Sequence, residues 1–140
     1  MLKTFLVEDE VVVRETIKKM IPWEEHGFCL VGEAADGEMA LPLIRKTKPD
    51  LLITDIKMPF MDGLTLARMV KKDMPEIRIV ILSGYDDFNY AKQAIGIGVE
   101  DYLLKPITKK TSRVRENITK SFIERFRRMR KTAAGIFLRY

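Results

Sequence analysis

The sequence predicts an α/β protein in which a doubly wound, five-stranded parallel sheet carries helices on both faces. The first observation is that short apolar segments alternate with longer segments whose apolar residues recur every three or four positions. The second is that the short segments are strand-sized and end in polar residues, as expected for parallel strands that finish at one edge of a sheet. Repeated alternation of this kind favours right-handed crossovers between parallel strands.

The expected elements follow one another along the chain. Strands are expected at about residues 2–7, 28–33, 51–54, 77–82 and 99–104. Helices are expected at about residues 11–21, 37–47, 64–73 and 87–96, with a last helix from 112 onward. Asp62-Gly63 and Ser83-Gly84 are typical turn sequences, and Asp36 suits the cap of the second helix.

Pro42 conflicts with the second helix. A proline in a helix interior removes a backbone hydrogen bond and costs about 3 kcal/mol. We therefore expect that this helix either starts late or bends at Pro42.

Length and composition indicate an ordinary globular domain. A chain of 140 residues with 46% apolar and 32% charged residues suits one domain with its own core, and excludes a disordered or membrane-embedded chain. Residues 1–7 are too short for a signal peptide, and no apolar run reaches membrane-spanning length. We expect a cytoplasmic protein without membrane contact. Cys29 is the single cysteine, so no internal disulfide can form.

The net charge of +5 is unevenly distributed. Residues 1–106 hold 14 Lys and Arg against 18 Asp and Glu, a net charge of −4. Residues 107–140 hold 11 against 2, a net charge of +9. Because all the basicity lies in the tail, the net charge does not predict nucleic-acid binding by the globular part.

Polar residues stand where four of the expected strands end. They are Glu8-Asp9-Glu10, Asp55, Ser83 and Lys105-Pro106. Since parallel strands end at one edge of a sheet, carboxylates, a hydroxyl and an ammonium should converge in a single crevice. Taken singly, each of these groups is more simply a cap, a turn or a loop residue. Their conjunction is what predicts a site.

The motifs Val7-Glu8-Asp9-Glu10, Ile53 to Pro59, Leu82 to Tyr85 and Tyr102 to Pro106 closely resemble the receiver domain of two-component response regulators. The resemblance covers residues 1 to about 110 and implies the strand order 2-1-3-4-5. Gly84 to Ala91, Ile21-Pro22-Trp23 and Gly27-Phe28 resemble in particular receivers that precede an AraC-type DNA-binding domain, as in YesN-like regulators.

The resemblance implies that Asp55 is phosphorylated. A carboxylate can attack phosphorus, but two negatively charged reactants need a divalent cation between them. Oxygen ligands on few side chains favour Mg²⁺. The resemblance makes Asp9 and Asp55 direct ligands, adds the Lys57 backbone carbonyl, and assigns Glu8 a contact through water. Glu8 stands where many relatives have Asp.

The remaining roles also follow from the resemblance. Lys105 and Ser83 would bind phosphoryl oxygens, with Pro106 as a cis-proline that aims the lysine inward. Ser83 would then draw its loop inward, and Tyr102 would follow that movement as part of a partner-binding face. The simpler reading of Tyr102 is a strand aromatic that packs against a helix.

The tail departs from the family pattern. Lys109-Lys110 would oppose the helix dipole in a first turn, so the last helix should start later. An apolar stripe runs from Val114 to Phe137. We expect a receiver domain at 1–110, and at 111–140 a last helix plus a basic tail or linker toward an absent effector domain. A dimerisation helix, an anion-binding arm and an ordinary packing helix are the alternatives.

These expectations define a function. The protein would be a phosphoacceptor switch that accepts a phosphoryl group from a sensor histidine kinase and regulates transcription, contacting DNA only through an effector domain missing from this chain. A homodimer is possible, and a stand-alone receiver acting through a protein partner is the alternative. An enzyme is disfavoured because aspartyl-phosphate hydrolases need an acid where Lys57 stands, so only slow self-dephosphorylation is expected. Nucleotide binding lacks a glycine-rich phosphate loop.

Overall fold

The computed structural model describes residues 1–83, 88–99 and 101–104 and shows five strands and four α-helices in alternation. The strands are β1 (Leu2–Val7), β2 (Phe28–Ala34), β3 (Leu51–Asp55), β4 (Arg78–Ser83) and β5 (Asp101–Leu104). The helices are α1 (Val11–Met20), α2 (Gly37–Thr47), α3 (Gly63–Asp73) and α4 (Phe88–Ile97), with a short 3₁₀ helix η1 (Glu24–His26) after α1. The helix expected from 112 onward lies outside the described residues.

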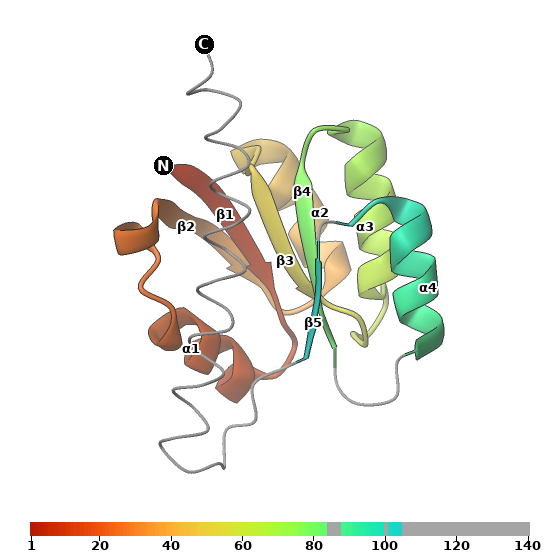
Figure 1. Ribbon diagram of the computed structural model, residues 1–140, viewed down its shortest axis with the longest axis horizontal. Coiled ribbons are helices and arrows are strands. Elements are labelled where there is room, and N and C mark those ends of the chain that lie inside the picture. The colour runs from red at the N-terminus through yellow and green to blue at the C-terminus, as the bar shows by residue number, and fades with distance from the viewer. Residues whose placement is uncertain (84–87, 100, 105–140) are drawn as a thin grey trace.

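The strands form one parallel sheet in the order β2-β1-β3-β4-β5 (Figure 1). Helix α1 lies on one face of this sheet, and α2, α3 and α4 lie on the other (Figure 1). The doubly wound α/β fold and the strand order predicted from the sequence are therefore confirmed. Parallel pairing requires long crossovers between strands, and the helices supply them.

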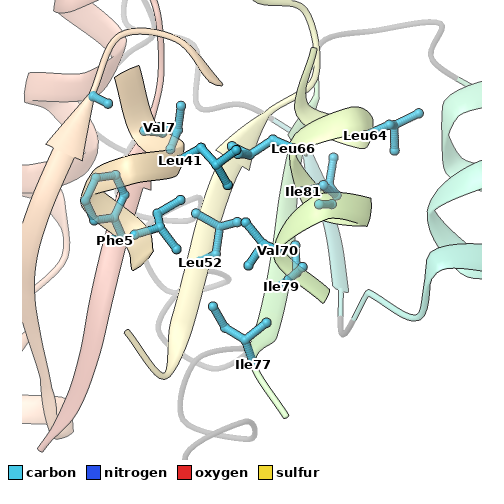
Figure 2. Packing of buried hydrophobic residues seen from close by; sticks show 14 of the residues in the cluster. Phe5, Val7, Leu41, Leu52, Leu64, Leu66, Val70, Ile77, Ile79 and Ile81 are labelled. Carbon is cyan, nitrogen blue, oxygen red and sulfur yellow. The ribbon is translucent and has the colours of Figure 1, made fainter. Parts of the chain in front are cut away.

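Alternate residues of each central strand enter two separate cores. Phe5 and Val7 of β1 pack with the residues of α2 and α3, whereas Leu6 between them packs with Val13 and Ile17 of α1. Figure 2 shows the first of these clusters, in which side chains from β1, β3 and β4 meet those of α2 and α3. Burial on both faces explains why the strands read as nearly continuous apolar runs.

Helix α2 begins well before Pro42. It starts at Gly37, and the side chain of Asp36 caps it by accepting a hydrogen bond from the Met39 backbone N–H at 2.8 Å. The expectation of a late start is therefore wrong, because capping by Asp36 fixes the first turn. Pro42 lies inside the helix with an exposed side chain.

Among the described residues, none of the helices combines the length and the apolar character needed to cross a bilayer.

Replacing Pro42 with alanine should stabilise the protein. The change supplies the amide that can donate to the Glu38 carbonyl and removes the ring that crowds this carbonyl. Alanine also makes the unfolded chain more flexible than proline does, which offsets part of the gain. We therefore expect the free energy of unfolding to rise by about 1–3 kcal/mol. Urea denaturation measures this change. Lys46→Ala, at an exposed position of the same helix, is the control and should stay within about 0.5 kcal/mol of the parent. A Pro42→Ala variant no more stable than this control would contradict the explanation.

Candidate functional site

The strand register brings three polar positions to one edge of the sheet. Val7 of β1 is level with Thr54 of β3, so the turn that begins at Glu8 leaves the sheet beside Asp55. Asp55 is in turn level with Leu82, and Ser83 ends β4 one position later. All of these positions lie at the carboxyl ends of parallel strands, where ligands bind in open α/β sheets.

Three carboxylates gather in the turn after β1. One carboxylate oxygen from each of Glu8, Asp9 and Glu10 lies within 4.8 Å of the other two. Glu8 is fully buried, Asp9 is half-buried and Glu10 is exposed, so the cluster reaches from the sheet edge to the surface. This grading leaves the outer carboxylates open to a ligand from solvent.

Local hydrogen bonds hold this turn in place. The Glu8 backbone N–H donates to the Ala34 carbonyl at 3.1 Å, and the Glu10 N–H donates to Glu8 Oε1 at 3.3 Å. Arg14 Nη1 donates to the Glu8 carbonyl oxygen at 2.6 Å, which ties α1 to the turn. Helix α1 begins at Val11, and the partial positive charge of its first turn favours carboxylates beside it.

Asp55 is the last residue of β3 and is only 3% exposed. The Ile56 backbone N–H donates to Asp55 Oδ1 at 2.8 Å, and the buried Thr54 hydroxyl donates to the Asp55 carbonyl oxygen at 2.9 Å. The carboxylate is therefore held at the sheet edge by the main chain that follows it. A charge so buried requires compensation by hydrogen bonds, ion pairs or a metal.

The loop after Asp55 has an unusual backbone. The Met61 N–H donates to the Pro59 carbonyl at 2.8 Å, which closes a three-residue turn around Phe60. Phe60 has φ of 70° and a side chain that is 82% exposed. Positive φ in a turn of this size is strained for a residue with a side chain. The strain lies between Asp55 and the start of α3.

The donor set fits a divalent cation. Asp9 Oδ1 is buried and has no hydrogen-bond partner among the residues that the structure describes, although it belongs to a cluster of carboxylates. A hard cation such as Mg²⁺ prefers oxygen ligands and would satisfy this atom. The acids present therefore suit a metal, and Glu8, Asp9 and Asp55 are the side chains that could hold it.

The structure brings together some of the residues expected from the sequence. Glu8 and Asp9 lie in one cluster, Asp55 stands at the same edge, and Lys57 follows in the exposed part of the loop. The backbone of Ser83 ends β4, and the backbone of Tyr102 lies in β5. The side chains of both residues fall outside the description, and so do Lys105 and Pro106 entirely.

Two further residues belong to the site, and the sequence interpretation did not assign them a role. Glu10 contributes a carboxylate to the cluster, and its place in the acidic triplet is a signal that was available. Arg14 holds the Glu8 carbonyl from one turn into α1. No sequence signal distinguishes Arg14 from other basic helix residues, because the contact depends on how α1 leaves the turn.

Comparison with known proteins places these features in a family. A model described as the response regulator receiver domain matches residues 4–117. An uncharacterized response regulatory protein of Staphylococcus epidermidis is 48% identical over 107 residues, which are 76% of this chain and 42% of that protein. The transcriptional regulatory protein YesN of Bacillus subtilis is 42% identical over 106 residues, 76% of this chain and 29% of that protein. HptR of Staphylococcus aureus, also a transcriptional regulatory protein, is 42% identical over 107 residues, with shares of 76% and 42%.

Solved structures agree with this placement. The receiver domain of AraT, a response regulator from Geobacillus stearothermophilus, matches with a TM-score of 0.76 and 37% identity, over 95% of this chain and 98% of that one. The response regulator domain of CheB from Thermotoga maritima matches with a TM-score of 0.76 and 24% identity, over 91% and 95% of the two chains. The second likeness concerns the fold alone.

The chain belongs to the family of response regulator receiver domains, the signalling switches of two-component systems. Within this family its relatives include the transcriptional regulators YesN and HptR, which confirms the resemblance to YesN-like regulators seen in the sequence. The chain spans less than half the length of each of these relatives, 42% or 29%.

Replacing Phe60 with glycine should stabilise the protein although it removes a large side chain. The side chain is 82% exposed and buries little, whereas a left-handed backbone costs a residue with a Cβ about 1–2 kcal/mol. The greater entropy of glycine in the unfolded chain offsets part of this gain. We therefore expect a net rise in the free energy of unfolding of up to about 1 kcal/mol, measured by urea denaturation.

Two matched variants test this explanation. Lys48 is exposed and has φ of 48°, so Lys48→Gly should change the free energy of unfolding in the same direction as Phe60→Gly. Lys57 lies in the same loop as Phe60 without a positive φ, so Lys57→Gly should bring no gain. Equal effects of glycine at Phe60 and at Lys57 would show that backbone strain is not the cause.

Proposed function

We propose that this protein is a phosphorylation-dependent switch that accepts a phosphoryl group on Asp55 from a sensor histidine kinase, with Mg²⁺ as cofactor. The observation that carries the proposal is the position of the buried Asp55 carboxylate at the sheet edge, level with a turn that bears three clustered acids. Membership of the receiver family supports it.

The proposed reaction transfers a phosphoryl group from a histidine nitrogen to a carboxylate oxygen. A carboxylate oxygen of Asp55 forms a bond to the phosphorus of a phosphohistidine as the phosphorus–nitrogen bond breaks. The electron pair of that bond stays on the imidazole nitrogen, which takes a proton from solvent. The product is a mixed anhydride on Asp55, and its slow hydrolysis by water would return the carboxylate.

Asp9, Asp55 and the Lys57 carbonyl would hold Mg²⁺ directly, and Glu8 would act through water. When bound, the ion would neutralise charge on the phosphoryl oxygens and align them with the carboxylate. Arg14 and the Ile56 N–H act independently of the metal, since they fix the Glu8 turn and Asp55 Oδ1 respectively.

The response to phosphorylation would pass through residues on the neighbouring strands. Ser83 and Lys105 would bind the added phosphoryl oxygens, because a hydroxyl donor and an ammonium suit an anion that carries about two negative charges. The movement of Ser83 would be followed by Tyr102 on β5. These roles rest on the family pattern and on the place of Ser83 and Tyr102 in the sheet.

The output would be transcription regulation by a longer protein. We place the receiver at 1–110 and a last helix with a basic linker at 111–140, and assign DNA contact to an AraC-type effector domain outside this chain. YesN and HptR are transcriptional regulators, and the matching regions cover 29% and 42% of their lengths, which supports this assignment. A homodimer and a cytoplasmic location accord with this function. A stand-alone receiver acting through a protein partner is the alternative.

Phosphorylation is tested with acetyl phosphate and Mg²⁺. We expect mass spectrometry of the intact protein to show one added phosphoryl group, which Asp55→Asn abolishes because an amide is a poor nucleophile. Glu76→Gln, at an exposed position in the turn before β4, should be modified like the parent. Failure of the parent to gain the group, or an equal gain in Asp55→Asn, would defeat the proposal.

Metal binding is tested separately by calorimetric titration with Mg²⁺. Asp9→Asn removes a charged ligand, so we expect the dissociation constant to rise by about tenfold or more, a loss of about 1.4 kcal/mol. Glu76→Gln again serves as the control. It also removes one negative charge, but it lies before the start of β4 and not at the carboxyl ends of the strands. An unchanged affinity in Asp9→Asn would exclude Asp9 as a ligand.

A further inference from the structure

The first residue of α3 lies directly against the main chain of Asp55. A Cβ built on Gly63 would overlap the carbonyl oxygen of Asp55, and it would lie 2.8 Å from the Asp55 carbonyl carbon and 3.0 Å from Ile56 Cα. All three of these atoms belong to the backbone, so none can swing aside as the end of a flexible side chain would.

The reason for glycine at this position is the close approach and not an unusual backbone conformation. Gly63 has no left-handed φ, in contrast to Gly98, whose φ is 89°. A helical residue with a side chain could therefore adopt the backbone of Gly63 but could not occupy the space. Gly96, inside α4, has no described atom within 4 Å of its built Cβ apart from the nearby backbone of its own helix, and it shows that close approach is not general among the helical glycines.

Hydrogen bonds connect Gly63 to the acceptor carboxylate. The Gly63 N–H donates to the Ile56 carbonyl oxygen at 2.7 Å, and the Ile56 N–H donates to Asp55 Oδ1 at 2.8 Å. Asp62 fixes the same helix end by accepting a hydrogen bond from the Thr65 N–H at 2.7 Å. The start of α3 and the carboxylate of Asp55 thus bind opposite sides of one residue, Ile56.

We propose that Gly63 is a positioning residue for phosphoryl transfer: its missing side chain lets α3 seat on the Asp55–Ile56 backbone, and this seating sets the place of the acceptor carboxylate. The inference rests on the proposed function of Asp55. Any larger residue must push the helix or the strand end away, and a displacement of about 1 Å at a reacting group can slow a reaction by about 100-fold.

The test compares three variants of the full chain. Gly63→Ala adds a methyl group against the Asp55 carbonyl, Gly96→Ala adds the same group in open space, and Asp62→Ala removes the helix cap without adding an atom at Asp55. Asp62→Ala therefore controls for general loosening of the helix end. We expect Gly63→Ala to lower the phosphorylation rate with acetyl phosphate at least tenfold per folded molecule, with both controls within about threefold of the parent.

A second readout does not depend on phosphorylation. The amide proton of Ile56 reports its hydrogen bond to Asp55 Oδ1, so its NMR chemical shift should move in Gly63→Ala and stay near the parent value in Gly96→Ala. This readout separates the two proposals. An unphosphorylated parent would defeat the function of Asp55, whereas an unmoved Ile56 amide in Gly63→Ala would overturn the inference about Gly63 alone.

Folding of the variant is addressed in the same experiment. Gly63→Ala is also made together with Pro42→Ala, which is expected to add stability at an exposed position of α2. A double variant that folds and is phosphorylated at the parent rate would overturn the proposal. A double variant that still does not fold would also overturn it, because Gly63 would then serve folding as a whole and not the placement of the acceptor.

Discussion

The parallel pairing of β1 with β3 is the constraint on which the candidate site depends. Because Val7 is level with Thr54, the acidic turn and Asp55 leave the sheet side by side, although they are far apart in the sequence. The two apolar cores, one on each face of the sheet, keep this register, because a slip by one residue would move every side chain of a strand to the opposite face. The core of the protein thus determines where its acids meet.

This placement has an electrostatic cost that the rest of the site offsets. Glu8 is fully buried and Asp55 is 3% exposed, and buried carboxylates are unfavourable unless hydrogen bonds, cations or metals compensate them. The Ile56 N–H supplies part of that compensation, as does the first turn of α1. The buried Asp9 Oδ1, without a hydrogen-bond partner in the described part of the chain, marks where a cation would complete it.

The loop between Asp55 and α3 carries the unfavourable geometry of the site. Phe60 has φ of 70° between Asp55 and α3, and Gly63 lies in close contact with the Asp55 backbone. Strain of this kind persists only where the surrounding structure fixes the chain, and it is often found beside functional groups. Here the contact of Gly63 with the Asp55–Ile56 backbone on one side and the buried end of β3 on the other hold the loop in place.

The sequence by itself determined the fold class, the approximate bounds of the described elements and the residues that could form a site, because apolar periodicity and polar strand ends are local properties of the chain. It left the course of α2 around Pro42 undecided, and one of its two alternatives was wrong, since capping by Asp36 outweighs the proline. Only the tertiary structure decided that Arg14 holds Glu8 and that Gly63 touches Asp55. These contacts depend on how helices leave and return to the sheet, and no short stretch of sequence encodes that path.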